Sequence, residues 1–198
     1  MAASLTSTDL TLDNTSGASI PGTPSAGQTV IYPKDDKLLY YKNDAGQELP
    51  PGKVVQVVNF QTGAVATGTT VIPFDDTIPQ ITEGNEYMTL AITPTNANNI
   101  LRVSANFVVG SSTSGRIVAA LFQDATAGAL ASTTVPGVGG AVALQIECNV
   151  TAGTTSSTTF RVRAGINGAA TTTFNGEGGG RIFGTSTKAS ITITEYTP

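Results

Sequence analysis

Apolar and polar residues alternate with a period of two over much of the chain beyond residue 53. In residues 144–150, Leu, Ile, Cys and Val alternate with Gln, Glu and Asn, and in residues 160–164 Phe, Val and Ala alternate with two arginines. No window of 11 residues shows the apolar period of a helix. The pattern therefore predicts an all-β chain.

The strand candidates are short and are separated by clusters of Gly, Asn, Ser and Pro. Seven of them have a clear pattern: residues 54–60, 86–93, 99–109, 115–123, 142–150, 158–166 and 189–196. Two weaker candidates are residues 129–135 and 181–183. About eight strands in about 145 residues are typical of a jelly-roll sandwich of two sheets.

Two of these strand candidates, at residues 54–60 and 115–123, are apolar on both faces. One face of each should therefore meet the core, and the other should meet a second apolar surface. In a two-layer sandwich the second contact is expected to be another subunit, and the alternative is a covering loop of the same chain. The predicted subunit interface consists of eight residues: Val54, Val55, Val57, Val58, Ile117, Val118, Leu121 and Phe122.

The first 52 residues differ from the rest of the chain in composition and in the pattern of apolar residues. Residues 1–27 are rich in Ser, Thr, Gly and Pro without any period, which predicts an extended arm that orders against a partner surface. Residues 28–52 contain two β-prone runs bounded by turn residues, which predicts a small β-hairpin followed by a Pro-Pro-Gly linker. Residues 53–198 then form the predicted jelly-roll domain.

Charged residues make up only 12% of the chain, about half the usual share. Threonine, about one residue in six, fills many of the remaining polar positions and favours strands. Depletion of charge is also typical of surfaces that are buried between subunits. The composition therefore favours an oligomer.

Several partners and locations are excluded by the same sequence. The net charge is −4 and the basic residues are scattered, so nucleic-acid binding is not expected. The first ten residues lack the charged and apolar regions of a signal peptide, and no apolar stretch approaches the roughly 18 residues of a membrane span. A single cysteine fits synthesis in a reducing cytoplasm.

Candidate catalytic groups are scarce. The chain has no histidine, which removes Ser-His-Asp and Cys-His catalysis and imidazole metal ligands. Cys148 lies on the apolar face of its strand and is expected to be an inert thiol. We therefore predict no enzyme activity, no catalytic residue, no cofactor and no metal site.

Three acid pairs remain: Asp35-Asp36, Asp75-Asp76, and Glu83 with Glu86. Two carboxylates suffice for glycoside hydrolysis, and hard cations also take such oxygens. Against hydrolysis, the chain has no tryptophan and only 6% aromatic residues to form a sugar platform, and no Asp-x-Asp-x-Asp-Gly spacing indicates a calcium loop. Solvated turns are the simplest interpretation of these pairs.

Several segments together resemble bacteriophage virion proteins. Residues 25–32 (SAGQTVIY) and 37–48 (KLLYYKNDAGQE) look like a hairpin module near the N-terminus of phage fibre proteins. Residues 72–88 (IPFDDTIPQITEGNEYM) are similar to the opening of a fibre-tip domain, and residues 158–165 (TTFRVRAG) and 191–196 (ITITEY) resemble its last strands. The resemblance covers residues 25–198.

The resemblance implies a trimeric jelly roll of the TNF and complement-C1q type, displayed on a virion and docked on other virion proteins through residues 1–27. The chain contains no shaft of heptads or Gly-x-y repeats, which favours a short head fibre, a decoration protein or a small tail appendage. One alternative is a receptor-binding tip that recognises a host surface glycan through residues 125–140 or 152–157. A polysaccharide depolymerase is the other alternative.

Overall fold

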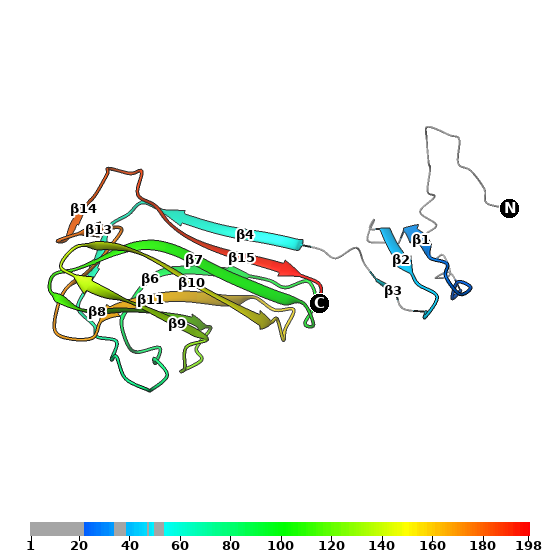
Figure 1. Cartoon of the computed structure of the whole chain (residues 1–198), viewed down its shortest axis with the longest axis horizontal. Coiled ribbons are helices and arrows are strands. Elements are labelled where there is room, and N and C mark those ends of the chain that lie inside the picture. Colours follow the sequence, from blue (N-terminus) through cyan, green and yellow to red (C-terminus); the bar gives the residue numbers. More distant parts are fainter. Residues whose placement is uncertain (1–21, 34–38, 47, 50–53) are drawn as a thin grey trace. The chain divides into compact units, whose positions relative to one another are not determined.

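The structure, a computed structural model, describes residues 22–33, 39–46, 48–49 and 54–198. The chain divides into two units, Met1–Lys53 and Val54–Pro198 (Figure 1). All regular elements in the described residues are β-strands, which confirms the predicted all-β class. This part of the chain has no helix long and apolar enough to cross a membrane. Of the arm predicted at residues 1–27, only residues 22–27 belong to the described part.

The first unit contains a small antiparallel sheet. Its strands are β1 (Val30–Pro33), β2 (Leu39–Lys42) and β3 (Glu48–Leu49), in the order β1-β2-β3. Gly46, at a φ of +78°, donates its N–H to the Asn43 carbonyl over 2.9 Å and closes the turn between β2 and β3. The predicted hairpin is confirmed, and β3 adds a third strand to it.

The second unit holds twelve strands. They are β4 (Val54–Thr62), β5 (Ala66–Gly68), β6 (Asn85–Ile92), β7 (Ile100–Ser111), β8 (Ser114–Gln123), β9 (Ala131–Val138), β10 (Ala141–Thr151), β11 (Thr158–Ile166), β12 (Thr172–Phe174), β13 (Gly176–Glu177), β14 (Gly180–Arg181) and β15 (Ala189–Tyr196). Eight of these are long, and they match the seven clear candidates and the weaker one at 129–135. The candidate at 181–183 is confirmed only at Arg181, which belongs to the two-residue strand β14, because Phe183 has a φ of +54° and lies outside it.

The eight long strands form two four-stranded antiparallel layers. One layer has the order β4-β15-β7-β10, with β12 beside the far end of β7 and β5 beside β12, and the other has the order β6-β11-β8-β9. The first long strand thus lies beside the last, the third beside the sixth, the second beside the seventh and the fourth beside the fifth. This arrangement is a jelly roll, as the strand count predicts.

The core lies between the two layers and is built from the inward positions of their strands. Leu144 and Ile146 of β10 are buried, whereas Gln145 and Glu147, each of which follows one of them, are exposed, as the alternation predicts. Aromatic residues fill one end of the core, where the Tyr87 and Phe174 rings stack with their centroids 4.9 Å apart. The faces of the two sheets that point away from this core are the candidate assembly surfaces.

Candidate assembly surfaces

The β8 half of the predicted subunit interface is buried within the chain. Ile117 and Leu121 belong to the main core, so they point between the two layers. Val118 and Phe122, on the opposite face, are only 5% and 0% exposed, because Ile72, Ile81 and Ala129 pack over them.

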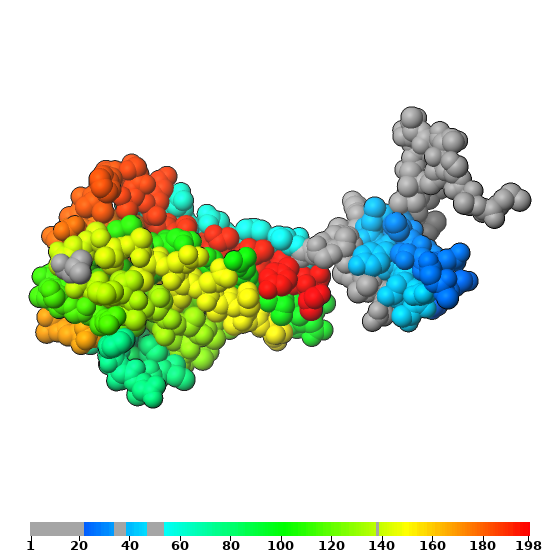
Figure 2. Space-filling view, in the orientation of Figure 1, coloured from blue at the N-terminus to red at the C-terminus, as the bar shows by residue number. Residues whose placement is uncertain are grey.

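The segment that covers β8 is held in place by backbone hydrogen bonds. Ile81 donates its N–H to the Ala127 carbonyl over 2.8 Å, and Ala129 donates to the Pro79 carbonyl over 2.9 Å. In Figure 2 this teal-green segment stands out from the body of the unit. A covering loop of the same chain, the alternative considered above, is therefore correct for β8, and a subunit contact at Ile117, Val118, Leu121 and Phe122 is wrong.

The β4 half of the predicted interface is largely accessible. Val54 is 60% exposed, Val57 is 55% exposed and Val55 is 38% exposed. Val58 instead packs partly against the core. Among the described residues β4 pairs only with β15, so it forms one border of its sheet, as Figure 1 shows. Phe60, which the sequence analysis did not select, adds another exposed apolar side chain at 41%.

The outer face of the layer β4-β15-β7-β10 continues from this border, and we call it the AB face. Period and register place small or uncharged polar residues over most of it: Asn59, Gln61, Ser190, Thr192, Thr194, Ser104, Asn106, Gln145 and Asn149. None of these residues is fully buried in the single chain. The AB face is therefore accessible in the single chain, and because it holds few charges, burying it would cost little free energy of desolvation.

The charged residues on the AB face form one ion pair, which has no net charge. Arg102 of β7 donates a hydrogen bond of 2.9 Å to Glu147 of β10, and this carboxylate raises the pKa of Arg102. The outer face of the other layer differs, because Glu86 there binds both Arg161 and Arg163 at 3.2 and 3.5 Å. The two outer faces of the sandwich thus have unequal charge, and the AB face is the one suited to burial against another subunit.

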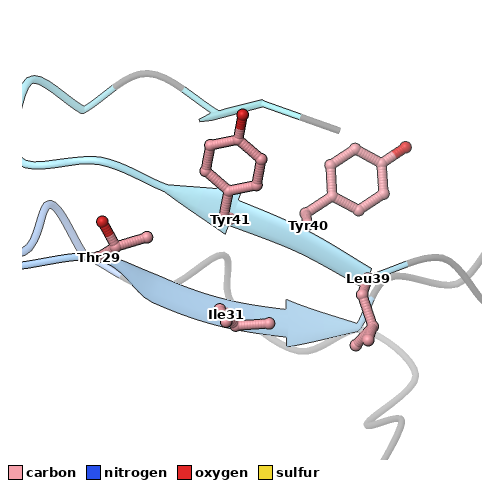
Figure 3. Close-up of a pocket in the computed structure, with 5 residues that line it drawn as sticks. All are labelled: Thr29, Ile31, Leu39, Tyr40 and Tyr41. Atoms are coloured by element: carbon pink, nitrogen blue, oxygen red, sulfur yellow. The ribbon is translucent and has the colours of Figure 1, made fainter. Parts of the chain in front are cut away.

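The first unit carries a second uncharged surface, which we call the hairpin face. Ile31 lies opposite Tyr41 in the register of β1 and β2, and Leu39 precedes Tyr41 by two residues, so all three share one side of the sheet. Ile31 is 62% exposed and Leu39 is 45% exposed. Together with Thr29 and Tyr40 they line a hollow of about 330 Å³ (Figure 3).

A buried carboxylate at one end of the jelly roll was missed by the sequence analysis. Glu195 of β15 is 0% exposed and accepts hydrogen bonds from Gln56 at 2.5 Å, from Asn99 at 2.6 Å, and from the N–H and hydroxyl of Thr95, each at 2.8 Å. Burial alone would raise the pKa of Glu195, but these hydrogen bonds together hold it below its ordinary value. The carboxylate ties β4, β15 and the 93–99 connection together.

The remaining candidate groups form no reactive constellation in the part of the chain that the structure describes. Burial raises the pKa of the Cys148 thiol to about 11, with a smaller contribution from Glu147, so the thiol is protonated at neutral pH. Asp75 is held in a turn by the Thr77 hydroxyl and N–H, which lower its pKa. Within the described ranges no group of three or more Cys, Asp or Glu is placed to hold a metal ion.

The acid pairs have different positions. Asp35-Asp36 lies outside the described residues. Asp75 and Asp76 line a polar hollow of about 360 Å³ with Thr77, Ser132 and their neighbours. Glu83 accepts the Gln80 N–H over 2.9 Å, while Glu86 binds the two arginines of β11. The hollow at Asp75 and Asp76 offers space for a ligand.

Comparisons with known proteins give distant likenesses only. No protein-family model matches the chain, and no curated protein matches it. It is similar to a solved structure described as "Bacillus endospore appendages form a novel family of disulfide-linked pili", with 13% identity and a TM-score of 0.29 over 75% of this chain and 98% of that one.

Two further solved structures are similar at the same level. A chain of infectious bursal disease virus, Gt strain, has 12% identity and a TM-score of 0.34 over 81% of this chain and 44% of that one. The exo-beta-1,3-galactanase from Phanerochaete chrysosporium has 10% identity and a TM-score of 0.27 over 77% of this chain and 32% of that one. Likenesses this distant carry no argument about function, which must be argued from the surfaces of the chain itself.

Proposed function

We propose that this chain is a non-enzymatic structural protein of a bacteriophage particle. It forms a homotrimer whose jelly rolls are displayed outward and whose residues 1–27 dock on other virion proteins of the head or tail. The phage assignment rests on the sequence resemblance over residues 25–198, and synthesis in the host cytoplasm fits the single cysteine.

One observation carries the proposal of self-assembly: the unequal charge of the two outer faces. The AB face is accessible, almost free of charge and bordered by the apolar residues of β4. Homo-oligomeric contacts are depleted of charge at their centre, and three copies of such a face can pack around a threefold axis without opposing like charges. The jelly-roll trimers implied by the resemblance also pack through one sheet, so the AB face is the proposed trimer surface.

Placing a lysine at the centre of the AB face should break the trimer. Asn106 is exposed on β7 and has Ser190 and Gln145 beside it, so Asn106→Lys brings an unpaired charge into the contact. We expect light scattering to give three chains for the unchanged protein and one chain for the variant at micromolar concentration, an increase of at least about 100-fold in the dissociation constant.

The matched control is Ala91→Lys, which adds the same charge to an exposed position of β6 in the other layer. It should leave three chains. Dissociation by Ala91→Lys alone would place the contact on the other layer, and a monomeric unchanged protein would refute self-assembly altogether.

Deletion of residues 1–27 should leave the trimer intact and abolish its incorporation into particles.

A second candidate function, glycan recognition by a fibre tip, is favoured by the polar hollow at Asp75 and Asp76. Its Asp, Thr and Ser side chains suit hydroxyl groups, and residues 129–132 of its wall fall within the predicted recognition segment 125–140. If this function holds, Asp76→Ala should reduce retention on a host-glycan array at least about tenfold. Equal retention of Asp76→Ala and Asp44→Ala, an exposed aspartate of the other unit, would exclude this site.

A further inference from the structure

The hairpin face is an exposed apolar surface in the described part of the first unit. That part spans residues 22–49 with gaps and holds one three-stranded sheet, on which Ile31 is 62% exposed and Leu39 is 45% exposed. Exposed apolar surface of this kind is typical of a site of contact with another protein. The chain's only cysteine lies in the other unit, so no disulfide within the hairpin stabilises this sheet.

We propose that the hairpin face is a second self-association surface, at which neighbouring copies pack Ile31, Leu39 and Tyr41 against one another. The inference rests on the proposed function, because it requires that the chain assembles with copies of itself. It adds a contact in the first unit to the trimer surface proposed in the second.

The charge pattern favours a copy of the same face as the occupant. Thr29, Ile31, Leu39 and Tyr41 are uncharged, and the alternation of β2 places Lys42 on the opposite side of the sheet. As far as the described residues of this face go, identical copies can therefore meet without opposing like charges, and a charged partner finds no complementary group among them. The hollow among these residues offers space for the protruding side chains of a neighbouring hairpin (Figure 3).

The length of the connecting chain supplies the second argument. Only residues 50–53 separate β3 from β4, and five residue steps span at most about 18 Å. Copies that assemble through the AB face must therefore keep their hairpins in a small shared volume. Short tethers of this kind give effective concentrations in the millimolar range, so even a weak contact between hairpin faces would form.

A cysteine crosslinking experiment on the full chain tests the contact. In a Cys148→Ser background, Ile31→Cys places a thiol on the hairpin face, and Ala45→Cys places one in the exposed turn of the same unit as a control with the same tether. Because each chain then has one thiol, a short bismaleimide can link two chains, and we expect covalent dimers to form at least about tenfold faster through Ile31→Cys than through Ala45→Cys.

Each outcome decides the inference. Equal crosslinking rates in a protein that still sizes as three chains would overturn the hairpin contact and leave the trimer standing. Crosslinks from Ile31→Cys to a different virion protein in assembled particles, with none between copies, would also overturn it. A monomer in both variants and in the unchanged protein would remove the proposed function as well.

A second variant measures, without a crosslinker, how much the contact between hairpin faces contributes to the stability of the trimer. Ile31→Lys combined with Leu39→Lys introduces like charges into every copy of the hairpin face. We expect the dissociation constant of the full-length trimer to rise at least about tenfold, as measured by dilution in light scattering. An unchanged dissociation constant would contradict the proposal even if the hairpin had lost its fold, because the loss of a contributing contact must weaken the trimer.

Discussion

Replacing Glu195 by alanine should lower the free energy of unfolding of the jelly-roll unit by at least about 3 kcal/mol. The substitution removes the carboxylate that accepts hydrogen bonds from Gln56, Asn99 and Thr95. Asn99 is buried, and a buried donor that loses its acceptor costs about 1–3 kcal/mol. Removal of the Glu195 side chain, which is 0% exposed, also leaves a cavity that adds to this cost. Urea denaturation followed by far-ultraviolet circular dichroism measures the loss.

Glu177→Ala is the matched control for this prediction. Glu177 is an exposed carboxylate on β13, and its removal should change the free energy of unfolding by less than about 0.5 kcal/mol. If the two variants were equally stable, the hydrogen bonds at Glu195 would contribute nothing to the fold, contrary to their geometry.

The pH dependence of stability has a defined sign at Glu195. Its pKa in the folded chain lies below the ordinary 4.5, so the stabilisation is complete above about pH 4.5 and is lost as the pH falls through the folded value. Glu195→Gln cannot titrate and should remove this part of the acid dependence. Parallel denaturation curves between pH 3 and 6 for the two proteins would show the difference.

Phe122→Ala should lower the free energy of unfolding by a similar amount, about 3–4 kcal/mol, without changing the number of chains in the assembly. Phe122 is fully buried on β8 beneath Ile72 and Ala129, and removal of a buried aromatic ring leaves a cavity. The measurements are urea denaturation and light scattering on the same sample. Phe183→Ala, at a position 82% exposed, should change neither quantity.

The Phe122 prediction separates the two explanations of a strand that is apolar on both faces. If the outer face of β8 met another subunit, Phe122→Ala would dissociate the assembly while the isolated chain kept its stability. Loss of stability with an unchanged assembly instead follows from a cover supplied by the same chain.

Strand positions could be predicted because the pattern that marks them is local. Alternation places Leu144 and Ile146 inward wherever β10 pairs, so the prediction did not require knowledge of its neighbours. The same rule could have found Glu195, which follows Ile191 and Ile193 at intervals of two and therefore had to point inward. An acidic residue in an apolar register was the available signal for a buried polar network.

The cover of β8 and the AB face could not be predicted in this way, because both depend on which distant segments come together. Nothing near Phe122 in the sequence indicates that Ile72, fifty residues earlier, lies over it. The three-residue strand β12 was missed for a related reason: Thr172–Phe174 is buried throughout and shows no alternation. Charge on a face likewise becomes visible only when the strand order assigns Arg102 and Glu147 to the same side.

The position of β15 between β4 and β7 also has a consequence for the order of events during synthesis. β4 leaves the ribosome about 130 residues before the strand that pairs with it, and at roughly 5–20 residues per second this interval is on the order of ten seconds. Meanwhile Val54, Val57 and Phe60 are available to the same strand of another nascent chain. The yield of soluble protein should therefore depend on the speed of translation and on the availability of chaperones until β15 has emerged.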